Sequence, residues 1–131
     1  MPLKILIVED HPDSREILVF QLRHVGYETI EAANGPEGIE KAIGQGPDLI
    51  VMDLGLPGIN GIDATVKLKQ NPKTANIPVI AYTAWEEQIY KDRALEAGMA
   101  EFLTKPTPPK VFGEVLQRVL QSNSRKMAST A

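Results

Sequence analysis

The feature that most constrains the fold is an alternation, repeated five times, of short apolar segments with longer amphipathic ones. The apolar segments predict strands at Lys4–Val8, Glu28–Ala32, Leu49–Asp53, Pro78–Tyr82 and Glu101–Thr104. The first and third are apolar at nearly every position, which is typical of strands covered by helices on both faces. Because parallel strands require crossover connections, this repeat predicts a parallel sheet with right-handed crossovers.

The segments between the strands predict five helices, each with an apolar stripe and a stop signal. Their stripes are Ile17, Leu18, Leu22 and Val25 before Gly26; Ile39, Ala42 and Ile43 before Gly44; residues 62–70 before Asn71-Pro72; Ile89, Ala94 and Leu95 before Gly98; and Val111, Phe112, Val115, Leu116 and Val119. We therefore predict a doubly wound α/β fold. Its five-stranded parallel sheet takes the flavodoxin-like order 2-1-3-4-5, with helices on both faces.

The bulk properties limit the classes of function. The 131 residues suit one domain, which we place at residues 1–121, with 122–131 as a flexible C-terminal tail or linker stub. A net charge of −3 offers no basic footprint for nucleic acid, and the absence of cysteine excludes disulfides and thiolate metal sites. We find no apolar run of membrane-spanning length and no signal peptide, so we expect a cytoplasmic protein without membrane insertion.

Carboxylates follow two of the predicted strands. Asp53 ends the third strand, and Glu9 and Asp10 follow the first. In the predicted order these strands are neighbours, about 4.8 Å apart, so the three acids must cluster. Clustered carboxylates raise one another's pKa unless a cation sits among them, and hard oxygen ligands suit Mg²⁺. The sequence therefore predicts a magnesium site at this edge of the sheet.

Two further strands bring complementary groups to the same edge. The fifth strand leads into Thr104-Lys105-Pro106, and the fourth ends in Tyr82-Thr83-Ala84. A carboxylate such as Asp53 can attack a phosphoryl group and form an aspartyl-phosphate, provided that positive charge offsets the charge on the phosphoryl oxygens. Lys105 supplies such a charge, and Thr83 supplies a hydroxyl.

These motifs, taken in order on successive strand ends, resemble the receiver domain of bacterial response regulators, and small stand-alone receivers in particular. The resemblance extends to about Gln121 and rests on Glu9-Asp10, Asp53 with Pro57-Gly58, Thr83-Ala84 and Lys105-Pro106. It implies a switch in two-component or phosphorelay signalling. Asp53 would accept a phosphoryl group from a histidine kinase or a histidine phosphotransfer protein. Such a domain catalyses its own phosphorylation and dephosphorylation and is not an enzyme that turns over a metabolite.

The resemblance also assigns roles to the other residues. Asp10, Asp53 and the backbone carbonyl of Gly55 bind Mg²⁺, with Mn²⁺ as a substitute, and Glu9 helps directly or through a water. Thr83, Ala84 and Lys105 bind the phosphoryl group. Phe102 turns inward when Thr83 moves, and the Lys105–Pro106 bond is cis. A downstream effector binds the face formed by the fourth helix, fifth strand and fifth helix.

Simpler interpretations remain open for several of these residues. Glu9-Asp10 could cap the first helix, Thr83 could cap the fourth, and Phe102 could be a core aromatic. We hypothesise that Gly55 opens the site to water and that the bulky Trp85, two residues after Thr83, shields it. These effects oppose each other, so the sequence does not predict the lifetime of the phosphoryl group. A degenerate receiver that binds partners without being phosphorylated is disfavoured because every reactive position is filled.

Two other classes of α/β protein use the same sheet edge. A haloacid-dehalogenase-like phosphatase would need a second acid two residues after its nucleophilic aspartate, where this chain has Gly55. A flavodoxin-like carrier of FMN would need a phosphate-binding loop after the first strand, where this chain has Glu9-Asp10-His11-Pro12-Asp13. Those acids would repel a phosphate. Both alternatives are therefore weaker than the receiver.

Overall fold

The computed structural model describes the backbone of residues 2–129 and the side chains of residues 2–125. Five strands alternate with five helices: β1 Lys4–Val8, α1 Pro12–His24, β2 Glu28–Ala32, α2 Gly35–Gln45, β3 Leu49–Met52, α3 Gly61–Gln70, β4 Val79–Thr83, α4 Gln88–Glu96, β5 Glu101–Thr104 and α5 Pro109–Ser129. The strands pair in parallel in the order β2-β1-β3-β4-β5. The predicted fold class and strand order are confirmed.

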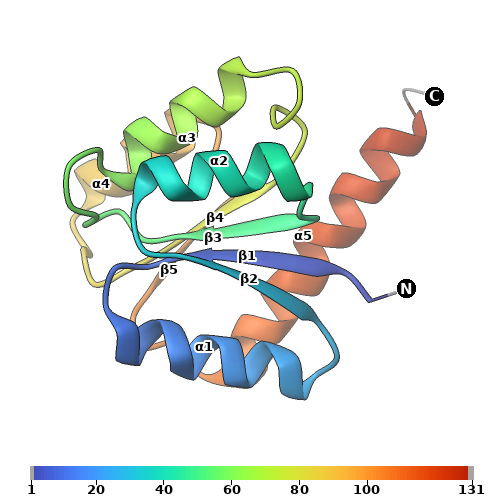
Figure 1. The fold of residues 1–131 in the computed structure, drawn as a ribbon, viewed down its shortest axis with the longest axis horizontal. Coiled ribbons are helices and arrows are strands. Elements are labelled where there is room, and N and C mark those ends of the chain that lie inside the picture. Colours follow the sequence, from blue (N-terminus) through green and yellow to red (C-terminus); the bar gives the residue numbers. More distant parts are fainter. Residues whose placement is uncertain (1, 130–131) are drawn as a thin grey trace.

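The helices form two layers around the sheet (Figure 1). Helices α2, α3 and α4 cover one face, and α1 and α5 cover the other. Strand β1 shows why both faces are apolar: Leu6 and Val8 pack under the α2–α4 layer, whereas Ile5 and Ile7 pack under the α1/α5 layer. Because side chains alternate along a strand, a strand between two helical layers must be apolar throughout.

The α2–α4 layer approaches the sheet closely through glycines. A Cβ atom at Gly38 of α2 would lie 2.8 Å from Cγ2 of Val8. At Gly61, the first residue of α3, a Cβ would collide with the carbonyl oxygen of Asp53 and lie 2.9 Å from the Cα of Leu54. The amide of Gly61 also donates to the carbonyl of Leu54 at 3.0 Å. Helix α3 therefore starts in direct contact with the chain that leaves β3.

Several element ends differ from the sequence-based expectation. Helix α2 continues past Gly44 and ends at Gln45, because the next residue, Gly46, takes the left-handed conformation (φ 55°) that closes the helix. Strand β3 ends at Met52, one residue before Asp53. Strand β4 is shifted by one residue, to Val79–Thr83. Asp53 accordingly lies in the turn that follows its strand.

The helical stripes were predicted correctly only in part. In α1 the buried residues are Leu18, Val19 and Leu22, whereas Ile17 is 60% exposed. In α4 only Ala94 is buried, and Leu95 is 52% exposed. Four other residues assigned to stripes are also exposed: Val25, Ile43, Ile89 and Val111. The sheet covers a narrow arc of each helix, so an apolar residue just outside that arc stays in contact with solvent.

Helix α5 continues to Ser129 and extends beyond the edge of the sheet (Figure 1). Residues 122–129, which we expected to be a flexible tail, are thus helical. The chain has no glycine or proline after Gly113 that would end the helix. Residues 130–131 lie outside the described part. The division into a domain at 1–121 and a separate C-terminal segment stays a prediction.

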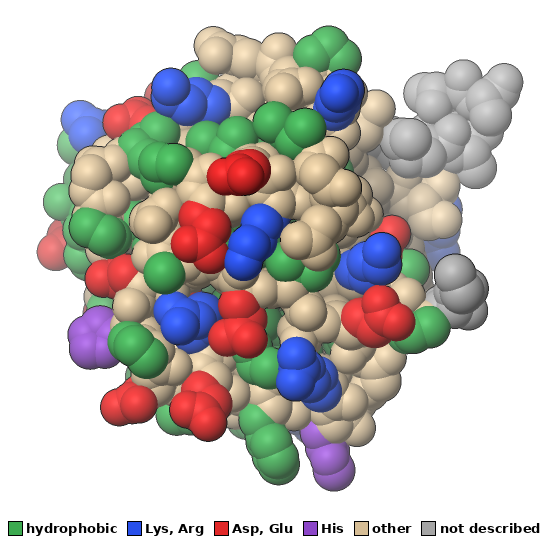
Figure 2. Space-filling model, in the orientation of Figure 1, with side chains coloured by type: hydrophobic (Ala, Val, Ile, Leu, Met, Phe, Trp, Pro, Cys, Tyr) green, Lys and Arg blue, Asp and Glu red, His purple; other side chains and the backbone are tan. Residues whose placement is uncertain are grey.

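The surface agrees with the modest net charge. On the face shown in Figure 2, basic and acidic side chains are interspersed, so the described residues of this face form no single-sign patch of the kind that binds nucleic acid. Among the described residues, no helix combines the length and the apolar character that crossing a bilayer would require.

Candidate functional site

The acid cluster forms where β1 and β3 end side by side. Val8 and Met52 are partners in the register of these two parallel strands, so Glu9 and Asp53 leave the sheet together. The amide of Asp53 still donates to the carbonyl of Val8 at 3.1 Å. One carboxylate oxygen from each of Glu9, Asp10 and Asp53 lies within 4.8 Å of the others. The structure therefore brings together the three acids that the strand pattern placed at one edge.

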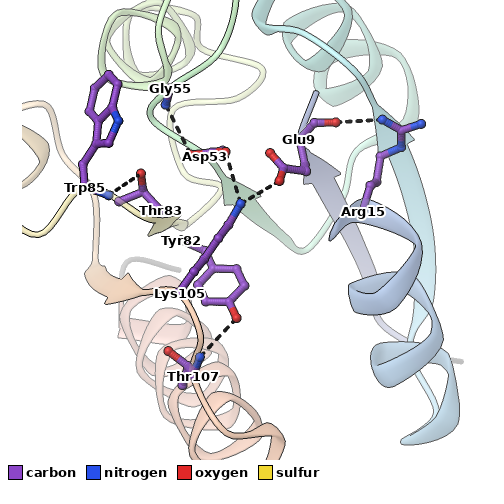
Figure 3. Close-up of polar contacts among 9 residues, drawn as sticks. All are labelled: Glu9, Arg15, Asp53, Gly55, Tyr82, Thr83, Trp85, Lys105 and Thr107. Atoms are coloured by element: carbon purple, nitrogen blue, oxygen red, sulfur yellow. Dashed lines mark hydrogen bonds and ion pairs between the residues drawn. The ribbon is translucent and has the colours of Figure 1, made fainter. Parts of the chain in front are cut away.

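Lys105 reaches into this cluster from the end of β5 (Figure 3). Its Nζ donates to Oε1 of Glu9 at 2.6 Å and to Oδ2 of Asp53 at 3.2 Å. All three side chains are largely withdrawn from solvent, so these ion pairs are screened less than surface pairs would be. The amide of Lys105 donates to the carbonyl of Thr83 at 2.8 Å, and the Lys105–Pro106 bond is cis, as the resemblance implied.

Glu9 is the one charged residue classed as buried among the described residues, with 5% of its surface exposed. Its Oε2 atom is buried and has no hydrogen-bond partner among them. The side chain therefore does not cap α1; His11 occupies the N-cap position there, without a side-chain hydrogen bond. A buried carboxylate oxygen with no partner, beside two further carboxylates, fits the ligand set of a hard divalent cation.

Burial and neighbouring charges give Glu9 and Asp53 very different pKa values. Burial, and then the neighbouring Asp53, raise the pKa of Glu9 from 4.5 to about 7, against the opposing effect of Lys105. Burial also acts to raise the pKa of Asp53, but hydrogen bonding with Glu9 and the charge of Lys105 outweigh it and hold that pKa below its ordinary value. Asp53 is thus a deprotonated carboxylate near neutral pH, as a nucleophile must be.

Lys105 responds to the same environment. Burial acts to lower its pKa, but the hydrogen bond to Glu9 and the charges of Asp53 and Glu9 outweigh burial and raise it. The ammonium form is therefore held firmly, and it offsets part of the negative charge of the cluster. A permanent cation beside Asp53 is what transfer of a charged phosphoryl group to that carboxylate requires.

Thr83 and the segment after it form the opposite wall of the site. Thr83 is 1% exposed, and its Oγ1 accepts a hydrogen bond from the amide of Trp85 at 3.2 Å. The N-cap of α4 is Glu87, so Thr83 does not cap that helix. Ala84, next in the chain, is exposed.

The expected aromatic partner of Thr83 lies on the same face of the sheet. Phe102 of β5 is paired with Ala81 of β4, two residues before Thr83, and it packs against the core under the α2–α4 layer. Side chains two apart on a strand share a face, so Thr83 and Phe102 project to the same side. Phe102 is half-buried in this conformation.

Gly55 and Trp85 meet beside the acids. The amide of Gly55 donates to Oδ1 of Asp53 at 3.2 Å. The indole of Trp85 lies so close that a Cβ atom at Gly55 would be 3.2 Å from its Cζ2. Trp85 also packs on Tyr90, with ring centroids 4.7 Å apart. The space left by the missing side chain of Gly55 is thus partly filled by the tryptophan.

Two contacts of the site escaped the sequence-based reasoning. Nη1 of Arg15 in α1 donates to the carbonyl of Glu9 at 2.8 Å and so fixes the chain where it leaves β1. The hydroxyl of Tyr82 accepts a hydrogen bond from the amide of Thr107 at 3.3 Å, below Lys105 in Figure 3. The signal for Tyr82 was present: an aromatic one residue before Thr83 must project to the opposite face of the sheet.

Comparison with known proteins places this site in a family. The model of the response regulator receiver domain matches residues 5–117. The phosphate regulon transcriptional regulatory protein PhoB of Pseudomonas aeruginosa is 38% identical over 89% of this chain, which spans 51% of that relative. The protein PilH of the same organism is 33% identical over 89% of the chain and 97% of the relative. The chain therefore spans about half of PhoB and nearly all of PilH.

Solved structures agree. A CheY-like receiver domain protein of Methanospirillum hungatei superposes with a TM-score of 0.90 over 96% of this chain and 99% of that one; at 24% identity it supports the fold alone. The receiver domain of the sensor histidine kinase PA1611 of Pseudomonas aeruginosa, solved with a magnesium ion in its active site cleft, has a TM-score of 0.86 and 32% identity over 92% of this chain and 99% of that one. The chain belongs to the response regulator receiver domain family of two-component signalling.

Proposed function

We propose that this chain is a phosphorylation-dependent switch in which Asp53 accepts a phosphoryl group from a phosphohistidine of a histidine kinase or a histidine phosphotransfer protein. The observation that carries the proposal is the placement of the Lys105 ammonium 3.2 Å from the largely buried Asp53 carboxylate within a cluster of three acids. Neither a turn nor a helix cap would require this arrangement.

The donor set fits a divalent cation, because three carboxylates converge and one buried oxygen of Glu9 has no partner among the described residues. Asp10, Asp53 and the carbonyl of Gly55 would hold Mg²⁺, with Glu9 as a direct or water-mediated ligand and Mn²⁺ as a substitute metal. When bound, the cation supplies positive charge that offsets the charge on the phosphoryl oxygens.

The side chains of the site would carry out the phosphoryl transfer itself. A carboxylate oxygen of Asp53 forms the new P–O bond as the P–N bond of the phosphohistidine breaks, and the donor imidazole keeps the electron pair and takes up a proton from solvent. Lys105 then follows the negative charge from Asp53 to a phosphoryl oxygen. Thr83 releases the amide of Trp85 and donates its hydroxyl to another phosphoryl oxygen, beside the amide of Ala84.

The output would be a shift between two surface conformations. Movement of Thr83 toward the phosphoryl group vacates space on the face of the sheet that Phe102 shares, and Phe102 turns inward to fill it. Such a rearrangement would change the surface formed by α4, β5 and α5, where we place the effector. The modification is of the protein itself, in the cytoplasm, and the phosphoryl group then either stays as a signal or passes along a relay.

The alternatives fit the site less well. Gly55 has no side chain to serve as the general acid of a dehalogenase-like phosphatase. The end of β1 presents Glu9 and Asp10 where a phosphate-binding loop of a flavin carrier would lie. A receiver that binds partners without phosphorylation would not need a nucleophile whose pKa is held low beside a lysine.

The test is intact mass spectrometry after incubation with acetyl phosphate, with and without Mg²⁺. We expect a single phosphoryl adduct on the wild type that requires Mg²⁺ and is absent from Asp53→Asn. Asp92→Asn is the matched control, because Asp92 is an exposed residue of α4 outside the site and should not affect the adduct. An unmodified wild type, or an adduct that persists in Asp53→Asn, would contradict the proposal.

A further inference from the structure

We propose that Tyr82 is a positioning residue for the phosphotransfer site, and that its ring holds Lys105 over the acid cluster. The inference rests on the proposed function, because it concerns the lysine that would neutralise the phosphoryl group on Asp53. It begins from the position of Tyr82 in β4, one residue before Thr83 and therefore on the opposite face of the sheet.

Three contacts connect Tyr82 to its surroundings. Nζ of Lys105 lies 5.7 Å from the centroid of the Tyr82 ring. The hydroxyl accepts from the amide of Thr107 at 3.3 Å, which ties the ring to the turn that carries Lys105. The edge of the ring meets Phe112 of α5, with centroids 4.9 Å apart and ring planes at 68°. The ring is thus fixed by two elements, and the Lys105 ammonium lies over it. Figure 3 shows the side chain of Lys105 passing beside the ring toward the acids.

The surroundings of Lys105 explain why it needs this support. On its α1 side the lysine borders a cavity of about 440 Å³, lined also by Ile17, Leu18 and Gln21 and by the prolines after Lys105. Packing on that side therefore does not restrain the side chain. Lysine has a flexible four-carbon stem, so a charge at its end is placed accurately only when something limits the stem. The aromatic face of Tyr82 does so and attracts the ammonium as well.

A structural interpretation stands beside this one: Tyr82 packs against the core under the α1/α5 layer, and any residue of similar size would then serve. The two interpretations differ in what they predict for the chemistry. If Tyr82 only fills space, its loss weakens folding and every property of the site together. If it positions Lys105, its loss slows phosphoryl transfer while the metal ligands, which come from other strands, keep their geometry.

The experiment compares Tyr82→Met and Tyr82→Phe with matched changes at Tyr27. Tyr27 packs partly buried against the same core but precedes β2, at the opposite edge of the sheet. Phosphorylation by acetyl phosphate at saturating Mg²⁺ gives the rate. Mg²⁺ affinity is followed by the fluorescence of Trp85, the single tryptophan, which lies against the proposed ligand Gly55.

We expect Tyr82→Met to lower the phosphorylation rate about tenfold, because small displacements of a charge-stabilising group are costly. Its Mg²⁺ affinity should rise, since a loosened Lys105 competes less for Glu9 and Asp53. Tyr82→Phe keeps the aromatic face and should stay within about threefold of the wild type. In a Lys105→Met background, Tyr82→Met should change neither the residual rate nor the affinity.

Several results would overturn the inference. Tyr27→Met could lower the rate as much as Tyr82→Met, or the loss caused by Tyr82→Met could persist without Lys105. If Tyr82→Met does not fold, Tyr82→Phe provides the test. A phosphorylation rate of Tyr82→Phe as low as that of Lys105→Met would show that the aromatic face does not position the lysine. A wild type that forms no adduct would refute the proposed function and this inference with it. A working wild type with unaffected Tyr82 variants would refute this inference alone.

Discussion

The two faces of the sheet are packed differently. Under the α2–α4 layer, glycines let helices touch the strands directly, as Gly38 does at Val8 and Gly61 does at the backbone of Asp53. Under the α1/α5 layer, a cavity of about 440 Å³ separates α1 from the turn that follows β5. Both layers rest on the same five strands, so the difference comes from the helices and turns that cover them.

The difference in packing between the two faces suits the roles proposed for Asp53 and Lys105. In the proposed switch, Asp53 would present its carboxylate from a fixed backbone, and the contact of Gly61 with the Asp53 backbone supports it. In the proposed switch, Lys105 would exchange Asp53 for a phosphoryl oxygen as its partner, and the cavity on its α1 side gives its stem room to do so. A protein interior packed to uniform density would restrain both residues equally.

The largest effect is expected under the α2–α4 layer, where helices contact the strands directly. Gly61→Ala forces a Cβ against the backbone of Asp53 and Leu54, which cannot rotate away, so we expect a loss of about 3 kcal/mol or more in the free energy of unfolding. The matched change under the other layer is Gly113→Ala in α5, where a Cβ would meet no atom within 4 Å. It should stabilise the protein by about 0.5–1 kcal/mol. Urea denaturation measures both, and effects of the same sign would refute the comparison.

The second effect concerns the acid cluster, and it is a dependence of stability on pH. Without metal, the folded protein holds the Glu9 proton up to about pH 7, whereas the unfolded chain releases it near 4.5. This contribution to stability is therefore full below the unfolded pKa and is lost as pH rises through about 7, by on the order of 3 kcal/mol. In the proposed site, Mg²⁺ would displace that proton, so its affinity should rise with pH over the same window.

The control for this pH dependence is Glu9→Gln. It removes the titrating group but keeps the size of the side chain. It should therefore abolish the part of the pH dependence of stability that comes from Glu9, and weaken the pH dependence of Mg²⁺ binding. Urea midpoints in chelator and in Mg²⁺, at about pH 5 and about pH 8, provide the measurement. An equally steep dependence in Glu9→Gln would assign the titration to another group.

A third effect concerns the lifetime of the phosphoryl group. The indole of Trp85 covers Gly55 beside Asp53, so Trp85→Ala should admit water and shorten the lifetime of the adduct severalfold. Decay is followed by intact mass after removal of acetyl phosphate. Phe20→Ala, which removes an aromatic side chain that is 72% exposed on α1, is the control and should leave the decay unchanged. An unaltered decay in Trp85→Ala would show that the indole does not shield the site.

The smallest effect is expected from a substitution in the cavity beside α1. Gln21 of α1 lines the cavity, and Gln21→Leu replaces a polar group there with apolar surface. We expect about 0.5–1 kcal/mol of added stability. Gln117→Leu on the exposed surface of α5 is the comparison, and it should have no effect beyond helix propensity. An equal gain from Gln117→Leu would mean that the cavity contributes nothing to the result.

The sequence predicted the fold and the acid cluster because both follow from strand ends. Apolar runs such as Leu49–Met52 mark buried strands, and the parallel order then places Glu9 next to Asp53. The exposure of Ile17 and Leu95 was not predictable in this way, since a stripe does not say how wide an arc the sheet covers. The helical extension of α5 was not predictable from polarity, because a polar segment without an apolar stripe can be either helical or disordered.

The supporting contacts needed three-dimensional information. Arg15 donates a hydrogen bond to the Glu9 carbonyl, and the hydroxyl of Tyr82 accepts one from the amide of Thr107, 25 residues later in the chain. Neither pair is visible in spacing or periodicity, because each depends on how one helix or turn settles on the sheet.

The contact at Gly61 has a consequence for engineering this domain. The segment Leu54–Asn60 leaves Asp53 and returns to it, because Gly61 touches the Asp53 backbone and its amide bonds the Leu54 carbonyl at 3.0 Å. Both ends of the loop are thus pinned to the same point of the sheet. A combinatorial library in this loop should accept changes at the exposed Pro57 but not at the buried Leu54 and Leu56. Each insertion or deletion would have to displace α3 or Asp53.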